Sequence, residues 1–168
     1  MADDLQALKD RADISDVVMR FATSVDTLDF ELYRSIFADR VDMDVSSFSG
    51  VPLERVSMDA WTEQIRGFLP GFDATQHVLT NPVIDVDGDD ARIVVYMKAE
   101  HFIANDQGDN SHAIGGNYQF GLKRVSGEWK IVAMTLNVTW SRGNRDIYRL
   151  AGERAARGTL APPGKPHW

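Results

Sequence analysis

Two residues of types that commonly carry out acid–base chemistry, Asp26 and His77, stand at the boundaries of predicted secondary-structure elements. Asp26 follows Met19 and Ala22 at helical spacing, so its carboxylate continues a stripe of apolar and small side chains. A carboxylate in such a stripe needs a partner, because burial of an isolated charge is costly. An imidazole suits that need, and an Asp that orients a His as general base is a recurring catalytic arrangement.

Both residues also have an ordinary structural interpretation. Asp26 is equally suited to be a helix-end or capping acid, and His77 a buried histidine with satisfied hydrogen bonds. The spacing between positions 26 and 77 does not establish a contact, so the two interpretations stay open on pattern alone.

The elements that must position these residues are helices first and strands later. Apolar residues at helical spacing predict helices over residues 3–25, 29–38, 58–68 and 145–157, the second with Asp29 as its N-cap. Alternating apolar residues predict strands over residues 41–45, 78–86, 91–104, 114–125 and 129–140. This order predicts an α+β fold, a cone-shaped curved antiparallel sheet whose N-terminal helices enclose an apolar cavity. The predicted division is a cone domain over residues 1–143, followed by a C-terminal helix and Pro-rich tail over 144–168.

Strand alternation sorts side chains into inward and outward sets. Odd positions from 93 to 103 form an apolar face on which His101 is the one imidazole. The corresponding faces of the next two strands carry Tyr118, Met134 and Trp140. We therefore expect these four side chains to face inward and to contact a bound substrate.

Composition excludes several classes of function. The 168-residue chain carries 18 Lys and Arg against 25 Asp and Glu, a net charge of −7, which argues against a nucleic-acid partner. Residues 111–168 reverse this balance with nine basic against three acidic residues, which predicts that this segment packs on the acidic remainder. The chain has no cysteine, so disulfides, thiolate zinc sites and cysteine nucleophiles are excluded.

Neither a membrane segment nor a metal site is predicted. No apolar run approaches the roughly 20 residues that span a bilayer, and the acidic N-terminus is unlike a secretory signal, so a cytoplasmic protein without a membrane partner is expected. Four residues are of types that bind metal ions and would be enough for a site: His77, Glu100, His101 and His112. Alternation turns Glu100 away from His101, however, and His112 lies at the end of a polar loop, so we expect no metal.

Six short segments, taken in order, resemble the SnoaL-like group of the nuclear transport factor 2-like superfamily over about residues 5–142. They are VDTLD at 25–29, LYRSIFAD at 32–39, TQHVLTN at 75–81, DGDDA at 87–91, GGNY at 115–118 and GEWKI at 127–131. The chain is most similar to the branch that holds scytalone dehydratase, bile acid 7α-dehydratase and hexachlorocyclohexane dehydrochlorinase. The resemblance implies elimination without metal or organic cofactor, through an Asp–His dyad that Asp26 and His77 match and a second histidine matched by His101.

The chain differs from that branch at the residues that determine substrate specificity. Val25 stands where scytalone dehydratases have a tyrosine, Phe21 where the bile acid enzyme has one, and Met134 where the dehydrochlorinase has an arginine. The resemblance therefore implies a reaction class and leaves the substrate open.

The leading hypothesis is a cofactor-free lyase, of dehydratase or dehydrohalogenase type, acting on a small hydrophobic and cyclic substrate. Isomerase or cyclase chemistry belongs to the same hypothesis. Two alternatives remain: a protein that binds a hydrophobic molecule without turnover, and a small structural subunit of a ring-hydroxylating dioxygenase. The resemblance also implies a homo-oligomer, trimer or dimer, in which the exposed sheet face and the basic C-terminal segment form the contact.

Overall fold

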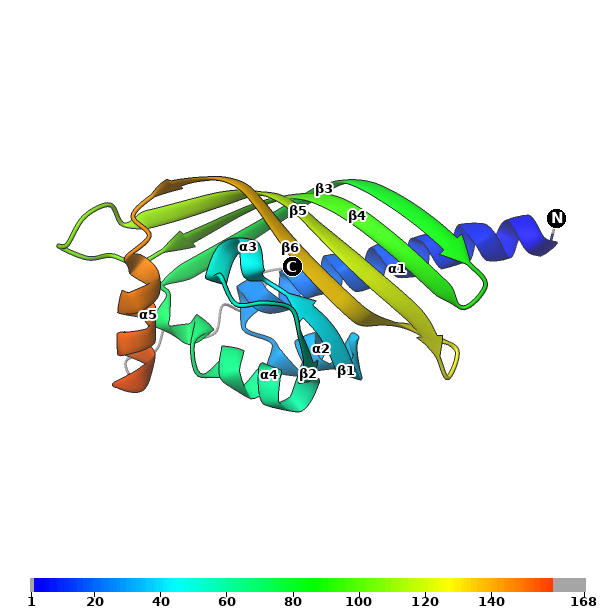
Figure 1. The fold of residues 1–168 in the computed structure, drawn as a ribbon, viewed down its shortest axis with the longest axis horizontal. Helices are drawn as coiled ribbons and strands as arrows, with labels where there is room; N and C mark the ends of the chain where they lie inside the picture. The colour runs from blue at the N-terminus through cyan, green and yellow to red at the C-terminus, as the bar shows by residue number, and fades with distance from the viewer. Residues whose placement is uncertain (1, 159–168) are drawn as a thin grey trace.

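A single long helix begins the chain and lies along the sheet. The computed structural model describes residues 2–158, and in it α1 covers Ala2–Thr27. Its buried side chains recur every three or four residues, at Ile14, Val18, Phe21 and Val25, and the helix packs mainly against β3 (Ala74–Asp87). Figure 1 shows α1 running beneath the long strands. The predicted helix over 3–25 therefore extends two residues further and includes Asp26 in its last turn.

Six short elements follow α1 before the long strands begin. In chain order they are α2 (Phe30–Ser35), β1 (Phe37–Asp44), α3 (Ser46–Ser49), β2 (Glu54–Ser57), α4 (Met58–Arg66) and the 3₁₀ helix η1 (Leu69–Gly71). The side chain of Asp29 accepts a hydrogen bond from the backbone N–H of Leu32 at 2.9 Å, as the N-cap prediction requires. The helix expected over 29–38 ends earlier, because Phe37 already pairs with a strand.

Six strands form one curved sheet in the order β2-β1-β6-β5-β4-β3. The long strands after β3 are β4 (Asp90–Phe102), β5 (Ser111–Val125) and β6 (Glu128–Gly143). All neighbours are antiparallel except β1 and β6, which run parallel. The α+β prediction is confirmed, whereas the sheet is mixed rather than wholly antiparallel. Parallel pairing is possible here because a long connection, not a hairpin, separates β1 from β6.

Two extra residues in β6 change which face its side chains occupy. Gly115 pairs with Trp140 and Gly116 pairs with Val138, so Thr139 is an additional residue, and a second irregularity lies beside Gly121. A bulge of one residue reverses the alternation beyond it. Trp140 consequently lies on the outer face, 48 % exposed, with its ring against the Cα of Gly115. The expectation that Trp140 faces inward is wrong for this reason.

A last helix, α5 (Ile147–Ala156), stands at the end of the sheet opposite the N-terminus (Figure 1). It packs on η1, where a β-carbon at Gly71 would lie 2.1 Å from the carbonyl oxygen of Ala151. Ile147, Phe72 and Ile103 belong to a small second core at this contact. The Pro-rich segment 161–168 lies outside the described residues, so the predicted tail stays a prediction.

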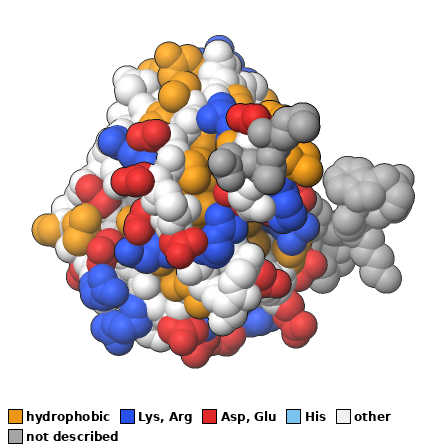
Figure 2. Space-filling model, turned by 90° about the vertical axis from the view of Figure 1, so that its right-hand side faces the viewer, with side chains coloured by type: hydrophobic (Ala, Val, Ile, Leu, Met, Phe, Trp, Pro, Cys, Tyr) orange, Lys and Arg blue, Asp and Glu red, His pale blue; other side chains and the backbone are white. Residues whose placement is uncertain are grey.

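The main core fills the space between α1 and the concave face of the sheet. Tyr118 and Met134 belong to it, together with side chains from α1, α2, β1 and β4. Acidic and basic side chains are interspersed on the end of the molecule that carries the N-terminus and two strand hairpins (Figure 2). Across residues 2–158, none of the helices has the length and apolar character required to span a bilayer.

Candidate active site

Asp26 and His77 form a hydrogen-bonded pair at the junction of α1 and β3. Nδ1 of His77 lies 2.7 Å from Oδ1 of Asp26, and the backbone N–H of His77 donates to Oδ2 at 2.6 Å. The hydroxyl of Thr75 donates to Oδ1 at 2.9 Å. The dyad side chains are shielded from solvent, His77 being 7 % and Asp26 21 % exposed. The structure therefore brings together the two residues that the sequence singles out.

The protonation states of this pair follow from its hydrogen bonds. Burial raises the pKa of Asp26, but the bonds from His77 and Thr75 outweigh that cost and hold the pKa below its ordinary value. An ionised carboxylate only accepts, so the proton on the shared bond belongs to Nδ1 of His77. In the neutral form of the imidazole the lone pair is then on Nε2, which has no hydrogen-bond partner among residues 2–158. This is the state that a general base requires.

Local backbone structure fixes the carboxylate in place. Leu28 adopts a left-handed conformation with φ of +57°, and the backbone N–H of Asp29 bonds to the carbonyl of Ser24 at 3.0 Å. The helix therefore ends directly after Asp26, whose side chain meets β3 at Thr75 and His77.

His101 lies beside the dyad on the inner face of β4. Its ring stands edge-to-face against that of His77, with centroids 5.6 Å apart. Burial and the neighbouring His77 and His112 lower the pKa of His101 to about 3, so its imidazole is neutral at pH 7. The placement agrees with the inward orientation expected for His101.

Two further residues, neither of them predicted from the sequence to lie here, complete the cluster. His112 is only 2 % exposed and is the register partner of His101 across β4 and β5. The hydroxyl of Tyr148, on α5, lies 3.0 Å from Nδ1 of His101 and 3.2 Å from Nδ1 of His112. Burial, followed by the nearby charge of Arg145, lowers the pKa of His112. The available signal was the alternation of β5, which places His112 in phase with Ile114 and Tyr118.

Comparison with known proteins gives the family. A model of the SnoaL-like domain matches residues 6–135. The chain belongs to the SnoaL-like domain family. No curated protein matches it in sequence. The predicted resemblance to the SnoaL-like group is therefore confirmed.

Solved structures share the fold of this SnoaL-like chain. A protein from Kribbella flavida is 26 % identical with a TM-score of 0.79, covering 86 % of this chain and 98 % of its own. A putative scytalone dehydratase from Novosphingobium aromaticivorans is 19 % identical with a TM-score of 0.70, covering 86 % and 93 %. Hexachlorocyclohexane dehydrochlorinase LinA-type3 from Novosphingobium barchaimii is 19 % identical with a TM-score of 0.70, covering 84 % and 94 %. At 19 % identity, the last two structures show that the fold is alike and no more.

The other predicted substrate contacts lie in different surroundings. Burial, followed by the nearby Tyr33, Tyr148 and Asp26, raises the pKa of Tyr118, so its phenol lies within electrostatic reach of the dyad carboxylate. Tyr118 packs edge-to-face on Phe21 at 5.3 Å, and Met134 is buried in the same core. Trp140 lies on the outer face, as described above. In residues 2–158, no group of three or more acidic and histidine side chains is arranged to hold a metal ion.

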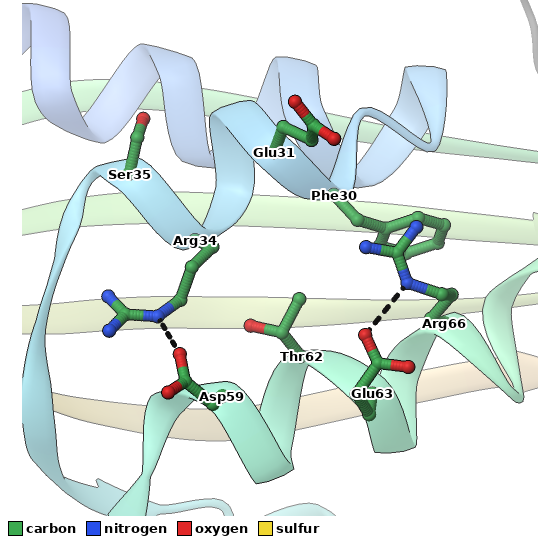
Figure 3. Close-up of a pocket in the computed structure, with 8 residues that line it drawn as sticks. All are labelled: Phe30, Glu31, Arg34, Ser35, Asp59, Thr62, Glu63 and Arg66. Carbon is green, nitrogen blue, oxygen red and sulfur yellow. Dashed lines mark hydrogen bonds and ion pairs between the residues drawn. The ribbon is translucent and has the colours of Figure 1, made fainter.

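A separate hollow of about 480 Å³ lies between α2 and α4 (Figure 3). Ion pairs line it, Arg34 with Asp59 at 2.6 Å and Arg66 with Glu63 at 3.0 Å. The buried hydroxyl of Thr62 faces it without a hydrogen-bond partner among the described residues. This hollow shares no residue with the dyad.

Proposed function

We propose that this SnoaL-like protein is a cofactor-free lyase in which His77 is the general base and Asp26 its orienting partner. The observation that carries the proposal is the 2.7 Å contact between Nδ1 of His77 and an ionised, threefold hydrogen-bonded carboxylate. In the neutral imidazole that contact directs the lone pair to Nε2, the nitrogen that takes the proton in this proposal.

The proposed reaction is an elimination. Nε2 of His77 removes a proton from a carbon next to a carbonyl or next to the carbon that bears the leaving group. The C–H electron pair forms the new C=C bond while the C–X bond breaks and X departs with its electron pair. A halide leaves as the anion, and hydroxide leaves as water by taking the proton that His77 removed from the carbon. Asp26 stabilises the imidazolium formed on His77, and such proton transfers typically contribute about 10²–10⁴-fold each.

Two further considerations support this reaction class. The chain shares its fold with proteins named as a putative scytalone dehydratase and a hexachlorocyclohexane dehydrochlorinase. A neutral second imidazole, His101, lies beside the base, where it suits interaction with a carbonyl or leaving group.

The test is turnover of two probe classes, cyclic β-hydroxyketones including scytalone and chlorinated cyclohexanes including hexachlorocyclohexane. Water loss is followed by the absorbance of the conjugated product, and halide release by chloride analysis. We expect His77→Gln to lower kcat/KM by at least about 100-fold with an unchanged circular dichroism spectrum. Gln76→Ala, on the exposed side of the same strand, is the control and should retain activity.

A second candidate, binding of a hydrophobic molecule without turnover, rests on the same geometry. Asp26 accepts three hydrogen bonds, which also satisfies a purely structural acid. In that case a probe binds with the same affinity to the wild type and to His77→Gln, and no product forms. Equal turnover by the wild type and His77→Gln contradicts the lyase proposal.

A further inference from the structure

The hydroxyl of Tyr148 lies between two buried imidazoles that belong to neighbouring strands. It is 3.0 Å from Nδ1 of His101 and 3.2 Å from Nδ1 of His112. Its ring is held by edge contacts with Phe48 at 5.0 Å and Phe72 at 5.5 Å. Because α5 packs on η1, the helix brings this hydroxyl to the inner face of β4 and β5.

The chemistry of a phenol limits how this bridge can be protonated. Tyrosine has one O–H proton, which it donates to one partner while its oxygen accepts from the other. Burial raises the pKa of Tyr148, so the phenol keeps its proton at neutral pH. Nδ1 must then be bare on one histidine and protonated on the other. The two imidazoles are therefore held in opposite tautomers.

We propose that Tyr148 is a positioning residue that donates its O–H to Nδ1 of His101 and accepts the Nδ1–H of His112, so that His101 presents Nε2–H. This inference rests on the proposed lyase function, because the direction of the bridge follows from what elimination requires. His77 already supplies the bare nitrogen that takes the proton. The substrate carbonyl or leaving group then needs a hydrogen-bond donor, and the Nε2–H of His101 provides one beside the base.

The opposite arrangement, in which Tyr148 donates to His112 and accepts from His101, works against the reaction. It gives His101 a bare Nε2 next to the bare Nε2 of His77, which places two bases and no imidazole donor together. Protonation of His101 to an imidazolium does not supply the donor either, since burial and the adjacent His77 keep this ring neutral at pH 7. A neutral imidazole whose tautomer is fixed by Tyr148 is thus the state that complements His77.

The test is the tautomer of each histidine, measured by ¹⁵N–¹H long-range correlation spectra of the imidazole rings at pH 7.5. In the wild type we expect His101 to carry its proton on Nε2 and His112 on Nδ1. Tyr148→Phe should convert His101 from a single tautomer to an exchanging mixture. His77 should keep its proton on Nδ1 in both proteins, because Asp26 holds it. A wild-type His101 protonated on Nδ1, or an unchanged His101 in Tyr148→Phe, overturns the proposal.

Two further variants separate the bridge from a general loss of packing. Tyr33→Phe removes the hydroxyl of another buried tyrosine, which contacts Trp61 at 3.1 Å, and should leave all three ring tautomers unchanged. His112→Asn keeps a donor in the position of Nδ1–H, whereas His112→Leu removes it. We expect the single His101 tautomer to persist in His112→Asn and to be lost in His112→Leu. The reverse result overturns the proposal.

Turnover then distinguishes this inference from the lyase function itself. With an active probe substrate, Tyr148→Phe should lower kcat about 10-fold with KM unchanged, since the donor acts on charge that develops during the reaction. If the tautomers follow the prediction and none of the probes is turned over, the bridge stands and the proposed function fails. If a probe is turned over with an unaltered kcat in Tyr148→Phe, the positioning role fails and the lyase function stands.

Discussion

At the scale of the residue, the site depends on the hydrogen bonds that the carboxylate of Asp26 accepts. Oδ1 accepts from His77 and Thr75, and Oδ2 accepts the backbone N–H of His77. Each contact favours the ionised acid, and together they overcome the effect of burial on its pKa. A negative charge held this way selects the Nδ1–H tautomer of His77. In the proposed reaction it also stabilises the imidazolium that forms when Nε2 takes a proton.

Asp26→Asn separates that electrostatic role from simple packing. An asparagine has the same shape but lacks the charge. Its single carbonyl oxygen can replace only one of the two carboxylate oxygens, because the amide N–H₂ cannot accept a hydrogen bond from His77. We expect kcat/KM to fall by about 10²–10⁴-fold, measured on whichever probe the wild type converts. Thr75→Val removes only one neutral donor and should stay within about tenfold of wild type. An Asp26→Asn enzyme with wild-type kinetics would exclude Asp26 from the mechanism.

The sequence predicted Asp26, His77 and His101 but not the contacts of Tyr148 and His112 beside them, for a physical reason. Asp26 and His77 stand at element boundaries beside recognisable family segments, so their types and places were informative. Tyr148 is an aromatic residue on a short amphipathic helix, a pattern that normally indicates core packing. Its contact with His101 and His112 depends on how α5 docks on η1, which no local periodicity encodes.

At the scale of the element, the placement of Tyr148 depends on the close approach of α5 to η1. A β-carbon at Gly71 would lie 2.1 Å from the carbonyl oxygen of Ala151, so a larger residue must push the two elements apart. We expect Gly71→Ala to lower the free energy of unfolding by roughly 1–3 kcal/mol, measured by urea denaturation. Amide exchange over residues 147–156 should rise with it.

A glycine next to Ala151 in sequence provides a matched control for Gly71→Ala. Gly152 lies within α5 and has open space where a β-carbon would be added. Gly152→Ala should therefore stabilise the protein by about 0.5–1 kcal/mol through helix propensity. Equal effects of the two substitutions would contradict the role assigned to the Gly71 contact.

Periodicity predicted most elements correctly and failed where a strand is irregular. Alternation placed His101, Tyr118 and Met134 on the inner face, since β4 pairs regularly with β5 and the first bulge of β6 lies before Met134. It failed at Trp140 because the extra residue Thr139 reverses the faces, and bulges leave little trace in a hydrophobic pattern. The parallel pairing of β1 with β6 was missed because alternation identifies a strand without identifying its neighbour.

At the scale of the whole molecule, charge complementarity joins distant parts of the chain. The basic character of residues 111–168 predicted contacts with the acidic remainder, and four such ion pairs form among the described residues. Two of them, Lys123 with Asp90 and Arg124 with Asp89, join β5 to the neighbouring hairpin of β3 and β4. Arg124 contacts Asp10 of α1 at 2.9 Å, and Arg154 of α5 contacts Asp73 at 2.6 Å. Burial raises the pKa of Asp10, but hydrogen bonds from Arg124, Gln6 and Trp129 outweigh it and lower the pKa below its ordinary value. The stability that this acid contributes is therefore lost only in strong acid, below its unfolded pKa.

The buried histidines make the free energy of unfolding depend on pH in a less acidic range than Asp10 does. Burial lowers the pKa of His101 from 6.5 to about 3, so below pH 6.5 the unfolded chain binds a proton that the folded protein does not. The stability linked to His101 is fully present above pH 6.5 and is lost as the pH falls toward 3. Between pH 7 and pH 5 the loss from this one group is about 2 kcal/mol. His112, whose pKa is also lowered, adds to it with the same sign.

Urea denaturation of the wild type and of His101→Gln at pH 7 and pH 5 measures the contribution of His101 to the pH dependence of the free energy of unfolding. Glutamine does not titrate, so the variant should lose about 2 kcal/mol less than the wild type between the two pH values, even if it starts from a lower stability. Other groups that titrate in this range contribute equally to both proteins, and the difference between their losses isolates His101. Parallel losses would mean that His101 accepts a proton within the folded protein. That outcome would also remove the argument that its Nε2–H acts as a neutral donor beside His77.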